Sequence, residues 1–277
     1  MHPRLEVLLL AILAAIPLFA AGCQGASPTM ERLPDSATAL GVAPDFAGTL
    51  WEMTGRRAWR SHDGGLSWQL VRGPGGAVSI AFTEIGGRTV GPKGSQLGNY
   101  GGTALTRPRP TPQVFVSITT PYHRTDRLYA LDLFAHVWVS ADAGRKWVEL
   151  RAARLPTTAL AIAAVRGDVV KPDTIYVACG KDGLWRSNDD GATFTHVAGA
   201  PVAYSVAMTT DDPSRLLLAG DKLYLSTDYA RTFLPVLNEK VDAVAFDPRN
   251  DRLAYAAVGR QLLRSVDGGH TWPSSTS

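Results

Sequence analysis

The carboxylates of this sequence that are best spaced for acid–base chemistry are Asp182 and Asp221, which occupy matching polar turns of two successive segments. Two carboxylates several ångströms apart are what a glycoside hydrolase needs, one as the acid and the other as the base or nucleophile. Aspartate is also frequent in turns because its side chain hydrogen-bonds the local backbone. The spacing leaves both interpretations open, so we assign no catalytic residue.

Other kinds of chemistry lack their motifs in the sequence. It contains no H-E-x-x-H, no clustered histidine and cysteine ligands, no G-x-S-x-G and no phosphate-binding glycine loop. The formal net charge is only +3, which gives no reason to expect a nucleic-acid partner. We therefore expect a protein without a metal or another cofactor.

The elements that must position these turns are strands of a repeated unit. Five stretches follow the pattern S-x-D-x-G-x-[ST]-[WF], with Lys146 in place of the hydroxyl residue in one copy and Ala230 in place of the glycine in another. The aspartate can accept hydrogen bonds from backbone N–H groups in a tight hairpin, and glycine tolerates the positive φ of such a turn. Lys146 and Ala230 therefore predict looser turns. The repeat aspartates are Asp63, Asp142, Asp189, Asp228 and Asp267.

The repeat resembles the Asp-box, or BNR, repeat of sialidases, sortilin-type receptor domains, some glucanases and photosystem II assembly factors, all of which are β-propellers. The resemblance implies an all-β fold in which antiparallel four-stranded sheets stand around an axis as blades. An Asp-box builds a blade and has no chemistry of its own, so it predicts the fold and hardly constrains the function.

The spacing of the repeats predicts six blades, because a four-stranded blade needs about 40 residues. The gap between Trp68 and Trp147 is about twice the later gaps, so one blade without an Asp-box is expected there. Its inner strand would span residues 77–82 and be followed by glycine- and proline-rich sequence over 86–112. We interpret that sequence as a degenerate blade, with a disordered or ligand-covering loop as the alternative.

Period-2 patterns and turn residues predict the strands of the last two units. Too little sequence follows Trp272 for a full outer strand, so residues 30–36 could complete the last blade, although they include Pro34. The predicted strands are 202–208, 216–219, 223–226 and 232–236 in one unit, and 241–246, 253–258, 261–265 and 271 onward in the other.

Propeller geometry places the repeat turns on one face and the second-to-third-strand turns and blade crossings on the other, where ligands of propellers usually bind. The second face would then be a mildly cationic channel mouth that attracts an acidic protein surface or an anionic carbohydrate, with charge segregated between the faces. Solvated turn residues without a ligand are the alternative. The candidate binding residues are Arg56, Arg57, Arg72, Arg151, Arg154, Lys181, Asp182, Asp221, Lys222 and Arg260.

The first residues are expected to direct export. Residues 1–22 have the basic start and short apolar core of a signal peptide, and the run is short for a membrane span. The sequence Ala-Ala-Gly-Cys that ends at Cys23 resembles a bacterial lipobox, which implies acylation of Cys23 and a lipid anchor on the periplasmic or cell-surface side of a bacterial membrane. A plain signal peptide is the alternative. Residues 23–36 would be a tether and 37–277 the propeller, with Cys179 as a buried, unreactive thiol.

These observations together predict a monomeric, non-catalytic binding or assembly scaffold for a protein or carbohydrate partner. A sialidase-like glycoside hydrolase is the alternative. Residues 31–35 are similar to the Arg-Ile-Pro motif of sialidases, which would give Arg32 the role of binding a substrate carboxylate. The other two arginines of their triad and their tyrosine nucleophile have no counterpart in this sequence.

Overall fold

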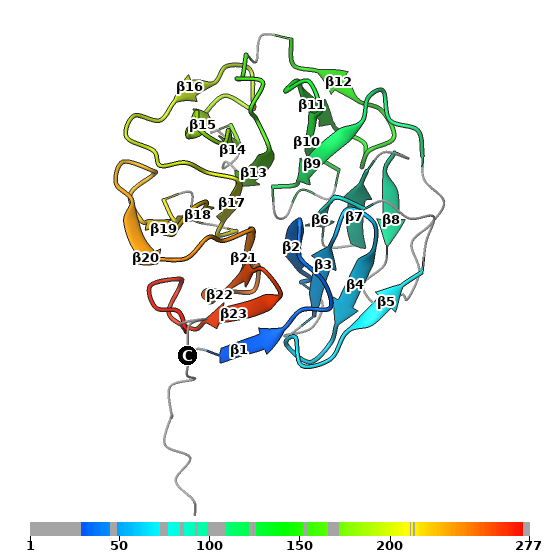
Figure 1. Ribbon diagram of the computed structural model, residues 1–277. Coiled ribbons are helices and arrows are strands. Elements are labelled where there is room, and N and C mark those ends of the chain that lie inside the picture. Colours follow the sequence, from blue (N-terminus) through cyan, green and yellow to red (C-terminus); the bar gives the residue numbers. More distant parts are fainter. Residues whose placement is uncertain are drawn as a thin grey trace, which may run out of the picture.

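The computed structural model describes residues 29–44, 49–72, 77–83, 86–91, 94–98, 109–121, 124, 126–151, 154–165, 172–210, 212 and 214–273. The described residues form antiparallel sheets that stand around a central axis (Figure 1). Five of these sheets have four strands and one has three. The arrangement is a β-propeller, with the four-stranded sheets as its blades.

We name each sheet by its strands. The β2–β5 blade has β2 (Ala39–Val42), β3 (Leu50–Met53), β4 (Ala58–Ser61) and β5 (Gln69–Val71). The β9–β12 blade has β9 (Phe115–Thr119), β10 (Leu128–Asp132), β11 (Val137–Ser140) and β12 (Val148–Glu149). The β13–β16 blade has β13 (Ala161–Val165), β14 (Thr174–Ala178), β15 (Leu184–Ser187) and β16 (Thr195–His196).

Two more blades and the three-stranded sheet complete the ring. The β17–β20 blade has β17 (Ser205–Met208), β18 (Leu216–Ala219), β19 (Leu223–Ser226) and β20 (Leu234–Leu237). The closing blade has β21 (Ala243–Asp247), β22 (Asn250–Val258), β23 (Gln261–Ser265) and β1 (Thr29–Arg32). The three-stranded sheet has β6 (Ser79–Thr83), β7 (Gly86–Val90) and β8 (Gln96–Gly98).

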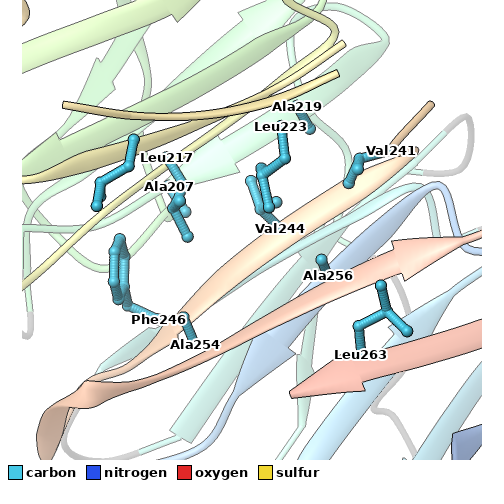
Figure 2. Close-up of a cluster of buried hydrophobic side chains, with 11 residues drawn as sticks. Ala207, Leu217, Ala219, Leu223, Val241, Val244, Phe246, Ala254, Ala256 and Leu263 are labelled. Atoms are coloured by element: carbon cyan, nitrogen blue, oxygen red, sulfur yellow. The ribbon is translucent and has the colours of Figure 1, made fainter. Parts of the chain in front are cut away.

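The inner strands close the ring around the axis. Strands β2, β6, β9, β13, β17 and β21 contact one another in that order, and β21 contacts β2. Their sequences are rich in small residues, as in Ala161–Val165 and Ala243–Asp247, which lets strands from every sheet approach the axis. Larger side chains fill the spaces between blades. In Figure 2, Leu217 of β18 and Phe246 of β21 belong to one buried cluster between two neighbouring blades.

The four-stranded blades share one register. In each of them the repeat serine ends the third strand and lies opposite a buried apolar residue at the same position of the second strand. Residues of different blades can therefore be compared position by position. The pairs are Leu50 with Ser61, Leu128 with Ser140, Ile175 with Ser187, Leu216 with Ser226 and Ala254 with Ser265.

The closing blade joins the two ends of the propeller. Strand β1 lies beside β23 in Figure 1. The two strands pair with Thr29 opposite Arg264 and Arg32 opposite Gln261. The closure expected from residues 30–36 is confirmed, and the strand ends before Pro34. The tether predicted over 23–36 extends too far, because Thr29–Arg32 form the blade's outer strand and Leu33 is buried beside Tyr255 and Leu262. Residues 1–28, which include the predicted signal peptide and Cys23, lie outside the described residues.

The number of complete blades differs from the number predicted from the spacing of the repeats. Among the described residues there are five four-stranded blades rather than six, and the sheet expected to be degenerate has three described strands and lies between β2 and β9. Its described neighbourhood continues only as an isolated bridge between Ser95 and Arg109, followed by Pro110 and Pro112. Proline lacks the N–H that a fourth strand would have to donate, so this stretch is a poor outer strand.

Candidate functional site

The five repeat turns, which we call the box turns (residues 61–68, 140–147, 187–194, 226–233 and 265–272), share one hydrogen-bonded structure. In the first, the Ser61 hydroxyl donates to Asp63 Oδ1 over 2.7 Å, and the Gly65 N–H donates to Ser61 Oγ over 2.8 Å. The Ser67 N–H and hydroxyl each donate to one oxygen of the Asp63 carboxylate. The same bonds recur around Asp189, Asp228 and Asp267. The box carboxylates are thus bound by their own turns.

The two imperfect copies keep this geometry to different degrees. Ala230 adopts a left-handed φ of 61°, and its N–H still donates to Ser226 Oγ over 3.1 Å, so the looser turn expected there is not observed. At Asp142 the Lys146 N–H donates to Oδ1 over 2.7 Å, but lysine has no hydroxyl for the second oxygen. The lysine copy therefore lacks one hydrogen bond of the set.

The hydrogen bonds hold the box carboxylates in the ionised form. The Ser67 hydroxyl, followed by the Ser67 backbone N–H, lowers the pKa of Asp63 to about 2. The Thr232 hydroxyl and N–H lower the pKa of Asp228 to about 2 in the same way. Donors around a carboxylate favour its charged form, so these turns are fully formed at neutral pH.

Arginines on the face of the box turns, the box face, link neighbouring blades. Arg127 Nε donates to the Tyr129 hydroxyl over 2.7 Å, and that hydroxyl donates to Asp173 Oδ2 of the next blade over 2.9 Å. Arg127 also lies 3.5 Å from Asp190 Oδ1 in the next box turn. Asp173 and Tyr129 are buried, so the cluster is largely shielded from water.

Three more arginines make comparable links. Arg88 donates to the carbonyl of Ala143, Arg186 donates to the carbonyl of Tyr229 over 3.0 Å, and Arg215 lies 3.3 Å from Asp251 Oδ2. The box face also exposes Arg145, Arg231 and Arg252. Cations therefore occur on both faces, and the predicted segregation of charge by face holds only in part.

A central channel of about 220 Å³ runs between the inner strands. Its polar lining consists of hydroxyl groups, among them Ser79, Ser117 and Tyr204, and the remaining lining residues are mostly small or apolar. None of the described residues that line it carries a charge. The channel lining thus offers no pair of carboxylates from these residues.

The ten predicted binding residues all lie at the opposite end from the box turns, and we call this end the rim. Each of the ten is exposed. Within the described ranges, no hydrogen bond or ion pair joins any two of them. Arg56 and Arg57 lie between β3 and β4, Lys181 and Asp182 between β14 and β15, Asp221 and Lys222 between β18 and β19, Arg260 between β22 and β23, Arg72 after β5, and Arg151 and Arg154 after β12.

Three of the ten have described partners elsewhere. Arg260 donates to the carbonyl of Pro34, Arg151 Nε lies 3.8 Å from a Glu149 oxygen, and Asp182 accepts a hydrogen bond from Thr158. The side chains of the other cations bind no group that the structure describes. Exposed cations of this kind can attract an anionic partner, and Asp182 and Asp221 lie in surface turns outside the channel lining.

Glu52 is a functional candidate that sequence reasoning missed. It lies on β3 near the rim, is fully buried, and neither of its carboxylate oxygens has a hydrogen-bond partner among the described residues. Burial raises its pKa to about 7, the negative charge of nearby Asp35 adds to this rise, and the charge of Arg260 offsets part of it. The matching positions of the other four-stranded blades are Ala130, Val177, Leu218 and Ala256. Aligning the repeats would have revealed this exception.

Cys179 is fully buried, and burial followed by the charge of Asp182 raises the pKa of its thiol to about 12. A neutral thiol in an apolar site is a poor nucleophile.

In the part of the chain that the structure describes, no group of three or more His, Cys, Asp or Glu side chains could hold a metal ion. Across the same ranges, no helix is long and apolar enough to cross a membrane.

The fold defines a class of protein, the β-propellers, and solved propellers are similar to it. YCF48 from Cyanidioschyzon merolae matches with a TM-score of 0.57 at 16% sequence identity, over 91% of this chain and 88% of that chain. YCF48 bound to a D1 peptide matches with a TM-score of 0.56 at 16% identity, over 90% and 85%. The GH74 xyloglucanase from Xanthomonas campestris matches with a TM-score of 0.52 at 19% identity, over 82% and 36%.

No protein-family model and no curated protein matches the sequence. The structural matches have sequence identities below 20%, so they show the fold alone. The chain spans about a third of the length of the xyloglucanase that it resembles. The function must therefore be argued from the residues of the rim and channel.

Proposed function

We propose that this protein is an exported, lipid-anchored binding or assembly scaffold without catalysis, whose rim holds an acidic protein segment or an anionic carbohydrate. The proposal includes that the five repeats of the chain are Asp-box repeats. A protein partner is the favoured of the two, because one similar propeller, YCF48, has been solved with a bound D1 peptide.

The observation that carries the proposal is the contrast between the rim cations and the channel beside them. Arg56, Arg72, Arg154, Lys181 and Lys222 are exposed, and their side chains bind no described group. The channel between the inner strands is uncharged over its described lining. An anionic segment would be attracted to the rim, while the hydroxyls of the channel mouth could satisfy its polar groups.

Alanine variants of the rim test this proposal. The Arg56→Ala/Arg57→Ala/Arg260→Ala protein should elute from immobilised polyglutamate or heparin at a clearly lower salt concentration than the wild type. The matched control, Arg145→Ala/Arg231→Ala/Arg252→Ala, removes the same charge from the box face and should elute like the wild type. Equal elution shifts for the two variants would reduce the effect to net charge and contradict a rim site.

A glycoside hydrolase is the second candidate, because GH74 enzymes share the fold and Asp182 and Asp221 lie on neighbouring blades. Arg32, the residue expected to bind a carboxylate in a sialidase, is exposed on the outermost strand and does not line the channel. A panel of xyloglucan and fluorogenic glycosides, including sialosides, decides between the candidates. Turnover that disappears in Asp182→Asn, Asp221→Asn or Arg32→Ala would make the protein an enzyme.

Export and lipidation rest on residues 1–23 and have their own test. Expressed with its own N-terminus in a bacterium, the protein should enter the detergent phase after Triton X-114 partitioning and incorporate a labelled fatty acid. Cys23→Ala should abolish the label and move the protein to the aqueous phase. Label that persists in the variant would exclude Cys23 as the acylated residue.

A further inference from the structure

The turn between β10 and β11, residues 132–136, differs from the other rim turns. It exposes two adjacent large apolar side chains, with 61% of Leu133 and 65% of Phe134 accessible to solvent. The corresponding turns of the other four-stranded blades carry Arg56 and Arg57, Lys181 and Asp182, Asp221 and Lys222, or Arg260. Single exposed apolar residues are ordinary, but two adjacent ones on the face that binds ligands in propellers call for an explanation.

The turn is held rigid from below by Asp132. This buried carboxylate accepts hydrogen bonds from the Phe134 N–H over 2.8 Å, from the His136 N–H over 2.9 Å and from Trp138 Nε1 over 3.0 Å. It also pairs with His136 Nδ1 over 3.1 Å. Several hydrogen bonds to one buried carboxyl group thus fix the backbone from which Leu133 and Phe134 project.

The backbone of the turn adds to this rigidity. Ala135 is 4% exposed, has a left-handed φ of 66°, and packs in the buried cluster between the β9–β12 and β13–β16 blades. Its methyl group fixes the turn from inside, while Leu133 and Phe134 point to solvent. An anchor that is ordered before binding loses little conformational entropy when a partner arrives.

The surroundings of the turn indicate the chemistry of a partner. The Leu133 N–H donates to the carbonyl of Val114, which is itself 36% exposed and extends the apolar surface. The Leu150 N–H donates to the carbonyl of Val137. Because the two segments run antiparallel, the next residue, Arg151, lies opposite His136. The Arg151 side chain is 88% exposed, and its Nε lies 3.8 Å from an oxygen of Glu149. Apolar anchors thus lie beside an exposed cation.

We propose that Leu133 and Phe134 form the apolar half of a protein-docking site, which holds a segment with an apolar side chain next to carboxylates. This inference rests on the proposed function and specifies the partner of the same rim. A bilayer is a poorer fit, because membrane surface binding needs a broad apolar face and the corresponding turns of the other four-stranded blades carry charged residues. Buried aromatic anchors surrounded by polar contacts are the usual centres of protein interfaces.

Selection from a random peptide-display library on the full protein provides the probe. The enriched peptides should combine Asp or Glu with an aromatic or large aliphatic residue. The affinity of one such synthetic peptide is then measured for the wild type, Leu133→Ser/Phe134→Ser and Leu66→Ser. Leu66 is the matched control, since it is 71% exposed but lies in a box turn on the other face.

The double variant should bind the peptide at least about 10-fold more weakly than the wild type, and Leu66→Ser should bind it equally well. The thermal midpoints of both variants should match the wild type, because the replaced side chains are exposed. Unchanged affinity of the double variant, or enriched peptides without apolar residues, overturns the inference. Unchanged affinity of the Arg56/Arg57/Arg260 alanine variant instead overturns the proposed rim site.

Vesicles of phosphatidylglycerol test the lipid alternative with the same proteins. The unacylated Cys23→Ala protein removes the contribution of the anchor. Its binding to vesicles should not change with Leu133→Ser/Phe134→Ser. Vesicle binding that the double variant loses, together with peptide binding that it keeps, would assign the turn to a membrane and reject the protein-docking site.

Discussion

The two faces of this propeller use arginine in opposite ways. On the box face, Arg88, Arg127, Arg186 and Arg215 each reach a carbonyl or a carboxylate of another segment, so their charge holds blades together. On the rim, Arg56, Arg72 and Arg154 extend into solvent without a described partner. The arginines that link blades thus lie on the box face, which also exposes Arg145, Arg231 and Arg252, whereas on the rim several arginines are free for recognition and Arg260 is bound to the carbonyl of Pro34. Counting charges in the sequence cannot separate these uses.

Glu52, a buried carboxyl near the rim, gives the largest expected effect. Its carboxyl pKa rises from 4.5 to about 7, so between these pH values the unfolded chain has lost a proton that the folded chain retains. The free energy of unfolding should therefore fall as pH rises from 4.5 to about 7 and stay constant above. Glu52→Gln should remove this dependence and stabilise the protein by about 3 kcal/mol at pH 8.

Urea denaturation of both proteins at pH 4.5 and pH 8 measures this difference. Glu31→Gln is the control, because it makes the same charge change on β1 where the side chain is only half-buried. The protection factors of β1 and β23, which correct for the intrinsic rise of amide exchange with pH, should also fall between pH 4.5 and about 7 in the wild type, since Glu52 lies near Asp35, just after β1. A pH-independent difference between wild type and Glu52→Gln would show that Glu52 ionises normally.

Removing an arginine that links two blades on the box face should have the next largest effect on the free energy of unfolding. Arg127→Ala removes the cation beside buried Asp173 and half-exposed Asp190, and should lower the free energy of unfolding by about 2 kcal/mol. Arg56→Ala on the rim should change it by less than about 0.5 kcal/mol. Chemical denaturation at neutral pH measures both. Equal effects of the two variants would erase the contrast between the faces.

The sequence predicted the parts of the fold that depend on local signals. Strands β18 and β19 have the predicted bounds, because each is a short apolar run between glycine or aspartate turns. Strand β17 begins three residues later than predicted, since Ala203 pairs with Gly180 of the preceding blade instead. Strand β20 begins at Leu234 rather than Thr232, because Thr232 is bound to Asp228 in the box turn.

The features that sequence reasoning missed depend on contacts between distant segments. Nothing near Arg127 in the sequence indicates that Asp190 will lie beside it in another blade. The order of the turns along each repeat was enough to predict that the candidate binding residues lie on the rim. Whether a cation there has an ion-pair or hydrogen-bond partner depends on residues of the neighbouring blade. Leu133 and Phe134 could have been noticed as apolar residues within a turn, which is an exception to the polar composition of the others.

The box carboxylates should make a smaller contribution to the free energy of unfolding, and this contribution should be lost at acidic pH. Their depressed pKa means that the stabilisation is fully present above the ordinary value of 3.8 and is lost as pH falls towards about 2. Asp63→Asn should therefore cost about 1 kcal/mol at pH 7, as loss of a capping carboxylate does, and almost nothing near pH 2. Asp221→Asn on the rim is the control and should leave the free energy of unfolding unchanged at both pH values. An Asp63→Asn cost that persists at pH 2 would mean that charge is not what these turns use.

The smallest expected effect concerns the one box turn without its glycine. Ala230 holds a left-handed φ of 61°, which costs a residue with a Cβ about 1 to 2 kcal/mol, although its methyl group is buried. Glycine removes that cost but loses the methyl contact and adds backbone freedom to the unfolded chain. Ala230→Gly should therefore stabilise the protein by only about 0.5 kcal/mol, a rise in thermal midpoint of a degree or two.

The reverse change, Gly191→Ala, should destabilise the matching turn of the β13–β16 blade. Gly191 has a φ of 86°, and an added Cβ would lie 2.8 Å from Leu150 Cδ1, closer than such atoms pack. Calorimetry should therefore give a higher thermal midpoint for Ala230→Gly and a lower thermal midpoint for Gly191→Ala than for the wild type. If both variants lose stability, the buried methyl of Ala230 outweighs its backbone strain, and that box turn is fixed by packing between blades rather than by its own conformation.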